Sequence, residues 1–230
     1  MPAPEDDIMP IGERFELPFL VPYYCQFCSP ELVLDIISGR VRAEDDPRWA
    51  EFGARTKRQY AYWAWRACGI ACLKMAIEAL GGPMRPMMYW IEAALAIDGF
   101  IQERRAQKGK PSGWIHRSLA ELGRQNGLVG ECRAPVDTEE IARCLDRRQV
   151  VIASVSHELG EWGPVTRNTG HMVVVHGYSR LDGLLEALLV NNPSGRYPEL
   201  RQNCWIPEKR FSAAFSGRII LFASKKNQRD

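Results

Sequence analysis

The stretch RACGIACLKM, residues 66–75, places two cysteines four positions apart, with a glycine directly after the first. Cys72 and Met75 fall on one apolar stripe with the alanines around them, so we predict a helix that begins at Cys68. The glycine pair that starts at Gly81 ends this helix. Cys72 then belongs to a buried face, where cysteine acts as a small hydrophobe, whereas Cys68 stands at the N-terminal end.

The position of Cys68 suits a nucleophile. A thiol at a helix N-terminus lies at the positive end of the helix dipole, beside unpaired backbone N–H groups. Both features favour the thiolate. We expect Gly69 to leave room for a substrate carbonyl near these N–H groups, which could then form an oxyanion hole.

Other uses of the cysteines are less well supported. Cys25 and Cys28 form a CxxC pair that could join Cys68 and Cys72 in a zinc site, but no glycine-rich knuckle surrounds either pair. CQFC follows an extended, proline-rich segment, whereas a redox pair should open a helix. Seven irregularly spaced cysteines suit free thiols in a reducing compartment. We expect no metal and no cofactor.

The composition indicates one globular domain. The 230 residues are 46% hydrophobic and 25% charged, and the net charge of +2 gives no reason to expect nucleic-acid binding. The acidic, proline-rich start is not a signal peptide, and no apolar run reaches membrane-spanning length. We therefore expect a cytoplasmic protein without a membrane partner; its oligomeric state stays open. Residues 1–16 read as a flexible arm, followed by a single domain over 17–230.

Helical patterns come first along the chain and strand patterns follow. We predict helices over SPELVLDIISGR (29–40), PMMYWIEAALAIDGF (86–100), a segment capped by Ser112, and a segment capped by Asp137. Strands are predicted over 150–155, 171–179, 184–192 and 218–224. This order favours an α+β fold with a mostly antiparallel sheet.

A thiolate nucleophile needs a base, and the chain has four histidines. His171 opens a strand directly after a glycine, where its ring can project over a cleft. His176 points to the opposite face of the same strand, because five positions separate the two. His116 and His157 read as a helix-surface and a loop residue. An asparagine in VNNPSG (190–195) could bond the far ring nitrogen of the base and fix its tautomer.

Taken in order, VPYYCQ, ACGIACLKM, VVIASV, GHMVVVHGY and LVNNPSG resemble the C39-like cysteine peptidases. These are papain-fold proteins related to bacteriocin-processing leader peptidases. The resemblance runs from Leu17 almost to the C-terminus. It implies a papain-like cysteine peptidase fold, and it implies that Cys68 is the nucleophile and His171 the general base.

Two positions depart from the family pattern. Asn192 stands where the family has Asp before Pro, and the neighbouring Asn191 is the alternative, since only one of two adjacent strand residues can face the base. The family's oxyanion glutamine matches Gln26 by context, but Gln26 lies far upstream of the cysteine. Gln59 is nearer and is the rival candidate; we favour Gln26.

If Gln26 is the donor, residues from about 27 to 60 are an insertion. Long loop insertions cost little, so the distance from the cysteine does not exclude Gln26. The insertion could be a lid over the substrate or a shield for the core. No transporter sequence accompanies the peptidase-like segments, so we expect a domain that acts without one.

The resemblance implies a peptidase or amidohydrolase that acts on a peptide or amide through a Cys-His-Asn triad and an acyl-enzyme. The same chemistry would serve an acyltransferase of a natural-product or peptide-modification pathway, in which an amine or thiol replaces water. A catalytically silent binding module with the same fold is the third reading. The expected partner is a peptide, or an acylated small molecule or carrier.

Overall fold

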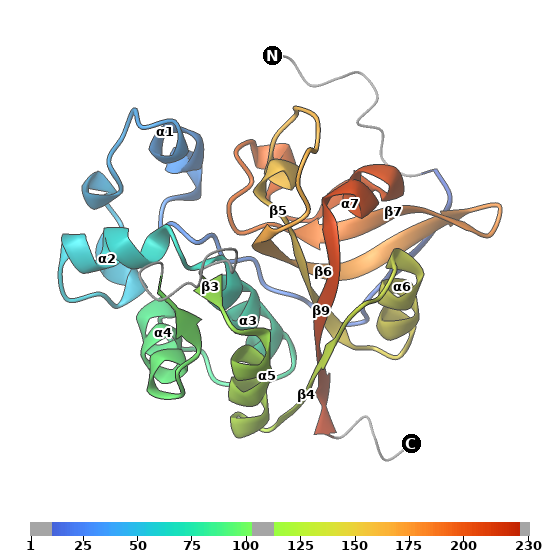
Figure 1. Ribbon diagram of the computed structural model, residues 1–230, viewed down its shortest axis with the longest axis horizontal. Helices are drawn as coiled ribbons and strands as arrows, with labels where there is room; N and C mark the ends of the chain where they lie inside the picture. The colour runs from blue at the N-terminus through green and yellow to red at the C-terminus, as the bar shows by residue number, and fades with distance from the viewer. Residues whose placement is uncertain (1–10, 103–112, 226–230) are drawn as a thin grey trace.

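The computed structural model describes residues 11–102 and 113–225, and these form two halves that lie side by side (Figure 1). Helices from the first part of the chain make one half, and a sheet from the second part makes the other. The predicted α+β order, helices followed by an antiparallel sheet, is confirmed.

The helices of the described residues are α1 (Val33–Ile37), α2 (Lys57–Ala64), α3 (Cys68–Ala79), α4 (Met87–Ala96), α5 (His116–Gln125), α6 (Thr138–Asp146) and α7 (Glu208–Ala214). The prediction that a helix begins at Cys68 is confirmed, and Asp137 caps α6 by accepting a hydrogen bond from the Glu140 N–H at 2.8 Å. The helix expected after Ser112 is α5. Ser112 lies outside the described residues, and α5 begins only at His116, with Ile115 as its N-cap, so the predicted cap is wrong.

The sheet has the spatial order β4 (Leu128–Arg133), β9 (Phe215–Ser224), β5 (Val150–Ser156), β6 (Gly170–Leu181), β7 (Leu184–Asn191) and β8 (Cys204–Pro207). Every pairing is antiparallel. A small separate sheet pairs β2 (Phe100–Ile101) with β3 (Gly113–Trp114). The predicted strands correspond to β5, β6, β7 and β9, whereas β4 and β8 were not expected.

The N-terminal arm becomes ordered earlier than expected. Residues Glu13–Glu16 form β1, which pairs with β6 beyond the point where β5 leaves it. The arm therefore completes the sheet edge. Residues 1–10 lie outside the described residues.

The segment that follows β1 links the two halves. The Leu17 N–H donates to the His176 carbonyl of β6. Tyr24 donates to Glu78 near the end of α3, and Tyr23 donates through its hydroxyl to the Asn192 carbonyl at 3.2 Å. VPYYCQ thus runs from the helical half to the turn after β7.

Residues 27–60 pack onto the helical half through buried side chains such as Phe27, Ile36 and Phe52. A buried carboxylate, Asp46, accepts hydrogen bonds from the Ser29 hydroxyl at 2.7 Å and from the Tyr60 hydroxyl. Because buried polar groups are costly unless they are bonded, this cluster ties the segment to α2.

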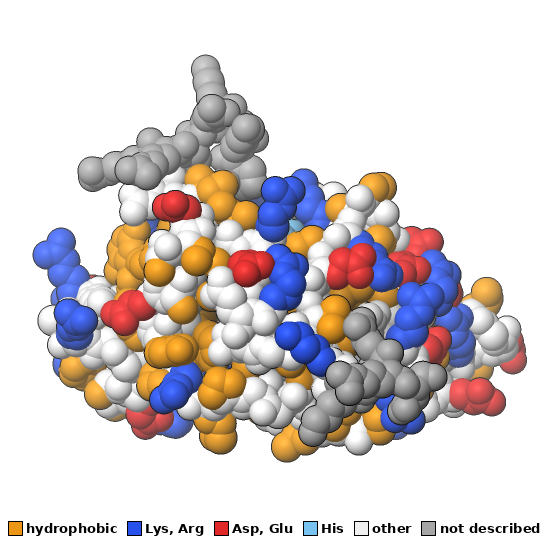
Figure 2. Space-filling model, turned by 90° about the horizontal axis from the view of Figure 1, so that it is seen from below, with side chains coloured by type: hydrophobic (Ala, Val, Ile, Leu, Met, Phe, Trp, Pro, Cys, Tyr) orange, Lys and Arg blue, Asp and Glu red, His pale blue; other side chains and the backbone are white. Residues whose placement is uncertain are grey.

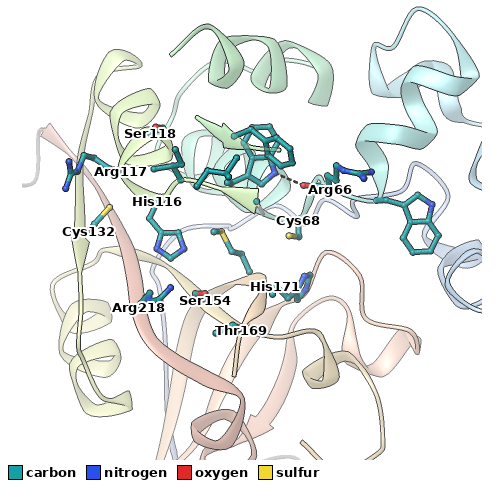
Figure 3. Close-up of a pocket in the computed structure, with 18 residues that line it drawn as sticks. Arg66, Cys68, His116, Arg117, Ser118, Cys132, Ser154, Thr169, His171 and Arg218 are labelled. Atoms are coloured by element: carbon teal, nitrogen blue, oxygen red, sulfur yellow. Dashed lines mark hydrogen bonds between the residues drawn. The ribbon is translucent and has the colours of Figure 1, made fainter. Parts of the chain in front are cut away.

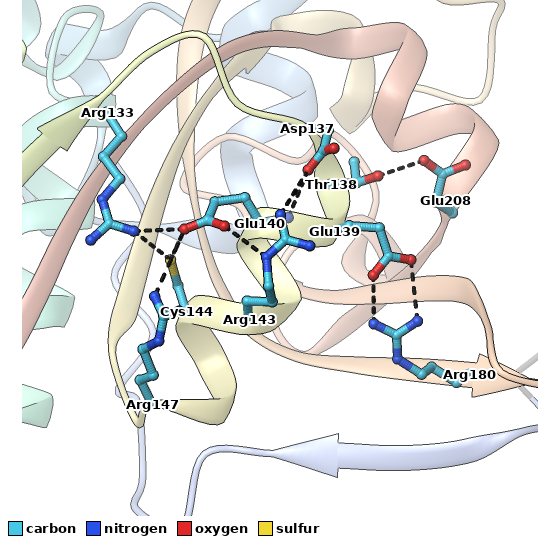
Figure 4. Close-up of polar contacts among 10 residues, drawn as sticks. All are labelled: Arg133, Asp137, Thr138, Glu139, Glu140, Arg143, Cys144, Arg147, Arg180 and Glu208. Atoms are coloured by element: carbon cyan, nitrogen blue, oxygen red, sulfur yellow. Dashed lines mark hydrogen bonds and ion pairs between the residues drawn. The ribbon is translucent and has the colours of Figure 1, made fainter.

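The helix α6 is held to the sheet by charged contacts (Figure 4). Glu139 binds Arg180 of β6 at 2.6 Å, and Thr138 donates to Glu208 of α7 at 2.8 Å. Glu140 accepts from Arg133 and Arg143 on the outer side. Most of these charged groups are still partly exposed to water, so we expect their ion pairs to fix the position of α6 more than they stabilise the fold.

The face shown in Figure 2 divides in the same way as the fold. Hydrophobic side chains are frequent over the helical half at the left, while charged side chains of both signs gather over the sheet half at the right. Among the helices of residues 11–102 and 113–225, none has the length and apolar character needed to cross a bilayer.

Candidate active site

A cavity of about 1080 Å³ opens between the N-terminal end of α3 and the start of β6. Cys68 and His171 both line it, and Figure 3 shows the Cys68 sulfur on the same side of the cavity as the His171 ring. The structure therefore brings together two residues that the sequence separates by about a hundred positions.

Cys68 occupies the first position of α3, where the backbone N–H groups have no helical partner. The N–H groups of Met172, Gly69 and Cys68 itself lie against its sulfur and favour the thiolate. Burial acts in the opposite direction and is the larger effect, so the pKa of the Cys68 thiol is raised. The N–H groups thus favour the thiolate, as expected, but they do not offset the effect of burial.

Gly69 has a different role from the one expected. A Cβ at this position would lie 3.0 Å from both Trp114 Cδ1 and Met172 Sδ, and 3.3 Å from Leu119 Cδ1. The space beside Gly69 is filled by side chains rather than left for a substrate carbonyl. The glycine lets the start of α3 approach Trp114 and β6, which positions Cys68.

His171 is 5% exposed and its Nε2 lies 2.8 Å from Asn192 Oδ1. If Nε2–H donates to this amide oxygen, Nδ1 keeps its lone pair and can accept a proton. Asn192 is held in turn, because its Oδ1 also accepts from the Ser194 N–H at 3.1 Å. The Ser194 hydroxyl lies 3.3 Å from His171 Nε2 and is a second partner, one that the sequence did not indicate.

The Asn191 side chain makes its hydrogen bonds on the opposite face of the sheet. Its amide donates to the Val21 carbonyl at 3.3 Å, and its Oδ1 accepts from the Asn203 N–H at 2.9 Å. Its side chain also bonds His176, whose pKa burial lowers to about 4. The geometry thus pairs Asn192 with His171 and Asn191 with His176.

The two candidate glutamines lie in different surroundings. Gln26 is buried, and its N–H donates to the Pro193 carbonyl at 2.9 Å, directly after Asn192. Gln59 instead accepts from the Arg55 N–H at 2.7 Å at the start of α2, so its side chain caps a helix. Of the two, Gln26 is the one tied to the turn that carries Asn192.

The resting protonation of the site follows from burial. Desolvation lowers the pKa of His171 to about 4, and the bond to Asn192 opposes this only in part. Because burial also raises the Cys68 pKa, it favours the thiol and the neutral imidazole over the ion pair at neutral pH. Such a pair can react by transferring the proton as the sulfur attacks.

The remaining cysteines lie outside the triad. Cys72 is fully buried in α3, which confirms its expected packing role. Cys132 is exposed and lines the far side of the same cavity, with His116 and Arg218. All seven cysteines are free thiols. Within the described ranges, no group of three or more His, Cys, Asp or Glu side chains is arranged to hold a metal ion.

His116 was read as a surface or packing residue, but it lines the cavity with Arg218 of β9. Figure 3 shows both on the far side of the cavity from Cys68. No local motif marks either residue, because they meet only through the contact of α5 with β9.

Comparison with solved structures finds similar chain paths. The chain has structural matches among C39 peptidase domains. The peptidase domain of Streptococcus ComA, a bifunctional ABC transporter, is 14% identical, with a TM-score of 0.46 over 70% of this chain and 93% of that one. A C39-like peptidase from Bacillus anthracis is 15% identical, with a TM-score of 0.48 over 70% and 90%.

A third match is a double-glycine-motif protease from an AMS/PCAT transporter, in complex with its leader peptide. It is 16% identical, with a TM-score of 0.43 over 67% of this chain and 82% of that one. No protein-family model matches the chain. No curated protein matches it by sequence.

Proposed function

We propose that this protein is a cysteine hydrolase of the C39-like type, which cleaves a peptide or amide bond through Cys68, His171 and Asn192. The observation that carries the proposal is the 2.8 Å contact between His171 Nε2 and Asn192 Oδ1 at the wall of the cavity that Cys68 also lines.

The reaction begins when the Cys68 sulfur attacks the substrate carbonyl carbon and His171 takes the thiol proton. The resulting oxyanion accepts hydrogen bonds from backbone N–H groups at the start of α3 and from the Gln26 side chain. As the C–N bond breaks, the imidazolium returns its proton to the leaving amine. Asn192 holds the ring in one tautomer throughout.

The second half reverses these roles. His171 takes a proton from water, the hydroxide attacks the thioester carbonyl, and the C–S bond breaks. The acid product leaves, and the proton returns to the Cys68 sulfur. An amine in place of water would give acyl transfer by the same steps.

The proposal is tested with p-nitrophenyl acetate as an acylating probe. Intact-mass and peptide mass spectrometry should find the acetyl group on Cys68, with none formed at this position in Cys68→Ala. Cys132→Ala is the matched control, since Cys132 is an exposed thiol that lines the same cavity but lies outside the triad. Acylation confined to Cys132, or equal at both thiols, would contradict the proposal. Adding glycinamide then separates hydrolysis from transfer.

A further inference from the structure

The cavity continues beyond Cys68 and His171 and changes character along its length. Near Cys68 its wall is apolar, with Trp65, Phe100 and Trp114, and the Phe100 and Trp114 rings lie 4.8 Å apart. At the far side it reaches His116 and Arg218 (Figure 3). The site thus has an aromatic section and a basic corner.

The charge of this corner is not balanced within the cavity. Of the described residues that line it, three are arginines and none is Asp or Glu. Among those three, Arg66 donates to the Tyr62 carbonyl at 2.9 Å, and Figure 3 draws the Arg117 guanidinium pointing away from His116. Arg218 is exposed, and no ion pair found among the described residues includes it. A cation in this setting favours an anionic ligand.

The backbone is shaped to present Arg218. Ala153 of β5 pairs with Ile219 of β9, but Val155 pairs with Phe215, so three residues of β9 face the single residue between them. Gly217, within this bulge, has φ 73°, a left-handed value that glycine adopts without strain. Bulges of this kind redirect side chains beside functional sites.

Two hydrogen bonds hold the bulge in place. The Ser216 hydroxyl donates to the Ser154 carbonyl at 2.9 Å, and the Val136 N–H donates to the Gly217 carbonyl at 3.0 Å. The backbone that carries Arg218 is therefore fixed on both sides, which suits a recognition residue better than a solvated surface arginine.

His116 complements this arginine. It begins α5, so the positive end of that helix faces the same corner. Burial and the neighbouring Arg218 lower the His116 pKa, which keeps the ring neutral and able to donate one hydrogen bond. With His116 neutral, the Arg218 guanidinium carries the positive charge of this corner.

Resting on the proposed function, we infer that the substrate is an amphipathic amide whose apolar body lies on Phe100 and Trp114 and whose distal carboxylate, or similar anion, binds Arg218. The cavity of about 1080 Å³ is large enough for a ligand of several residues or a long acyl chain. Arg218 then selects substrates by charge, at a point remote from the bond that breaks.

The test uses alkylating probes that need no amide cleavage. Iodoacetamido-alkanoic acids of increasing chain length are compared with their terminal carboxamides, and the alkylation rate of Cys68 is followed by peptide mass spectrometry. At the best length the acid should react roughly 10-fold faster than its carboxamide, because a charge-assisted hydrogen bond forms only with the acid. Arg218→Gln should bring this ratio to about 1.

The matched control is Arg148→Gln, an exposed arginine in the turn before β5, outside the cavity lining. It should keep the wild-type ratio. A ratio of about 1 at every length in the wild type, a ratio that survives Arg218→Gln, or an equal loss in both variants would overturn the inference. If the neutral probes alkylate Cys68 no faster than Cys132, it is the proposed nucleophile that fails.

Discussion

Two adjacent asparagines allow a paired test of the triad. Asn192 and Asn191 are both buried, and each makes side-chain hydrogen bonds, but only Asn192 bonds His171. We predict that Asn192→Ala lowers the acylation rate by roughly 10- to 100-fold, while Asn191→Ala changes it by less than about 3-fold.

The magnitudes follow from the contacts. Asn192→Ala removes a buried 2.8 Å hydrogen bond, which costs about 1–3 kcal/mol if the His171 Nε2 is left unpaired. The Ser194 hydroxyl at 3.3 Å can replace part of this bond, which keeps the loss below the upper end of that range. Asn191→Ala removes bonds to Val21 and Asn203 and should cost a similar amount.

The assay combines single-turnover release of p-nitrophenol with urea unfolding of each variant. Similar stability losses with a rate loss confined to Asn192→Ala would support the assignment. If Asn191→Ala loses as much rate as Asn192→Ala while both remain folded, Asn192 does not orient the base and the reasoning fails.

Three further predictions follow from the structure. Gly69→Ala should destabilise the protein by about 1–3 kcal/mol in urea unfolding, because its Cβ would lie 3.0 Å from Trp114 and Met172. The control Gly163→Ala has open space around it and should change the free energy of unfolding by less than about 0.5 kcal/mol. Equal effects of the two substitutions would contradict this reasoning. The pKa of His171 is lowered from 6.5 to about 4 on folding, so the unfolded chain binds the proton first, and this ring alone should remove about 3 kcal/mol of stability as pH drops from 6.5 to 4. His176, whose pKa is also lowered to about 4, adds a similar fall, so His171→Gln should reduce the slope without removing it. An unchanged slope in His171→Gln would argue against a buried neutral ring. Gln26→Ala should slow the acylation of Cys68 by about 100-fold, because it removes an oxyanion donor. Gln59→Ala should mainly weaken the hydrogen bond to the Arg55 N–H at the start of α2. A slower rate in Gln59→Ala than in Gln26→Ala would assign the oxyanion role to Gln59.

The parts of the fold that the sequence predicts have strong local signals. The start of α3 at Cys68 follows from helical spacing and the glycines beyond its end. β5, β6 and β7 are long apolar runs buried on both faces, which are readable without knowing their neighbours.

The elements that were missed depend on contacts between distant segments. β4 is an edge strand of mixed composition, interrupted by Gly130, that gains its conformation from pairing with β9. β8 ends in Pro207 and pairs only with β7 among the described strands. Edge strands of this kind carry weak alternation and proline, so local patterns do not mark them.

The same dependence on distant contacts explains which site residues the sequence indicates and which it does not. Cys68, His171 and Asn192 could be picked out because each stands at the end of a recognisable element. Ser194 and Arg218 could not, since a turn and a bulge set their directions. The favourable effect of the helix end on the Cys68 thiolate could be read from the sequence, whereas the larger, opposing effect of burial could not.

The most direct test of the central claim compares two buried histidines on opposite faces of β6. His171 faces the cavity that Cys68 lines, and His176 bonds Asn191 on the other face. The acylation rate of Cys68 by p-nitrophenyl acetate should fall at least about 100-fold in His171→Gln and less than about 5-fold in His176→Gln, with circular dichroism confirming both folds. Equal rates in the two folded variants would show that His171 is not the base that serves Cys68.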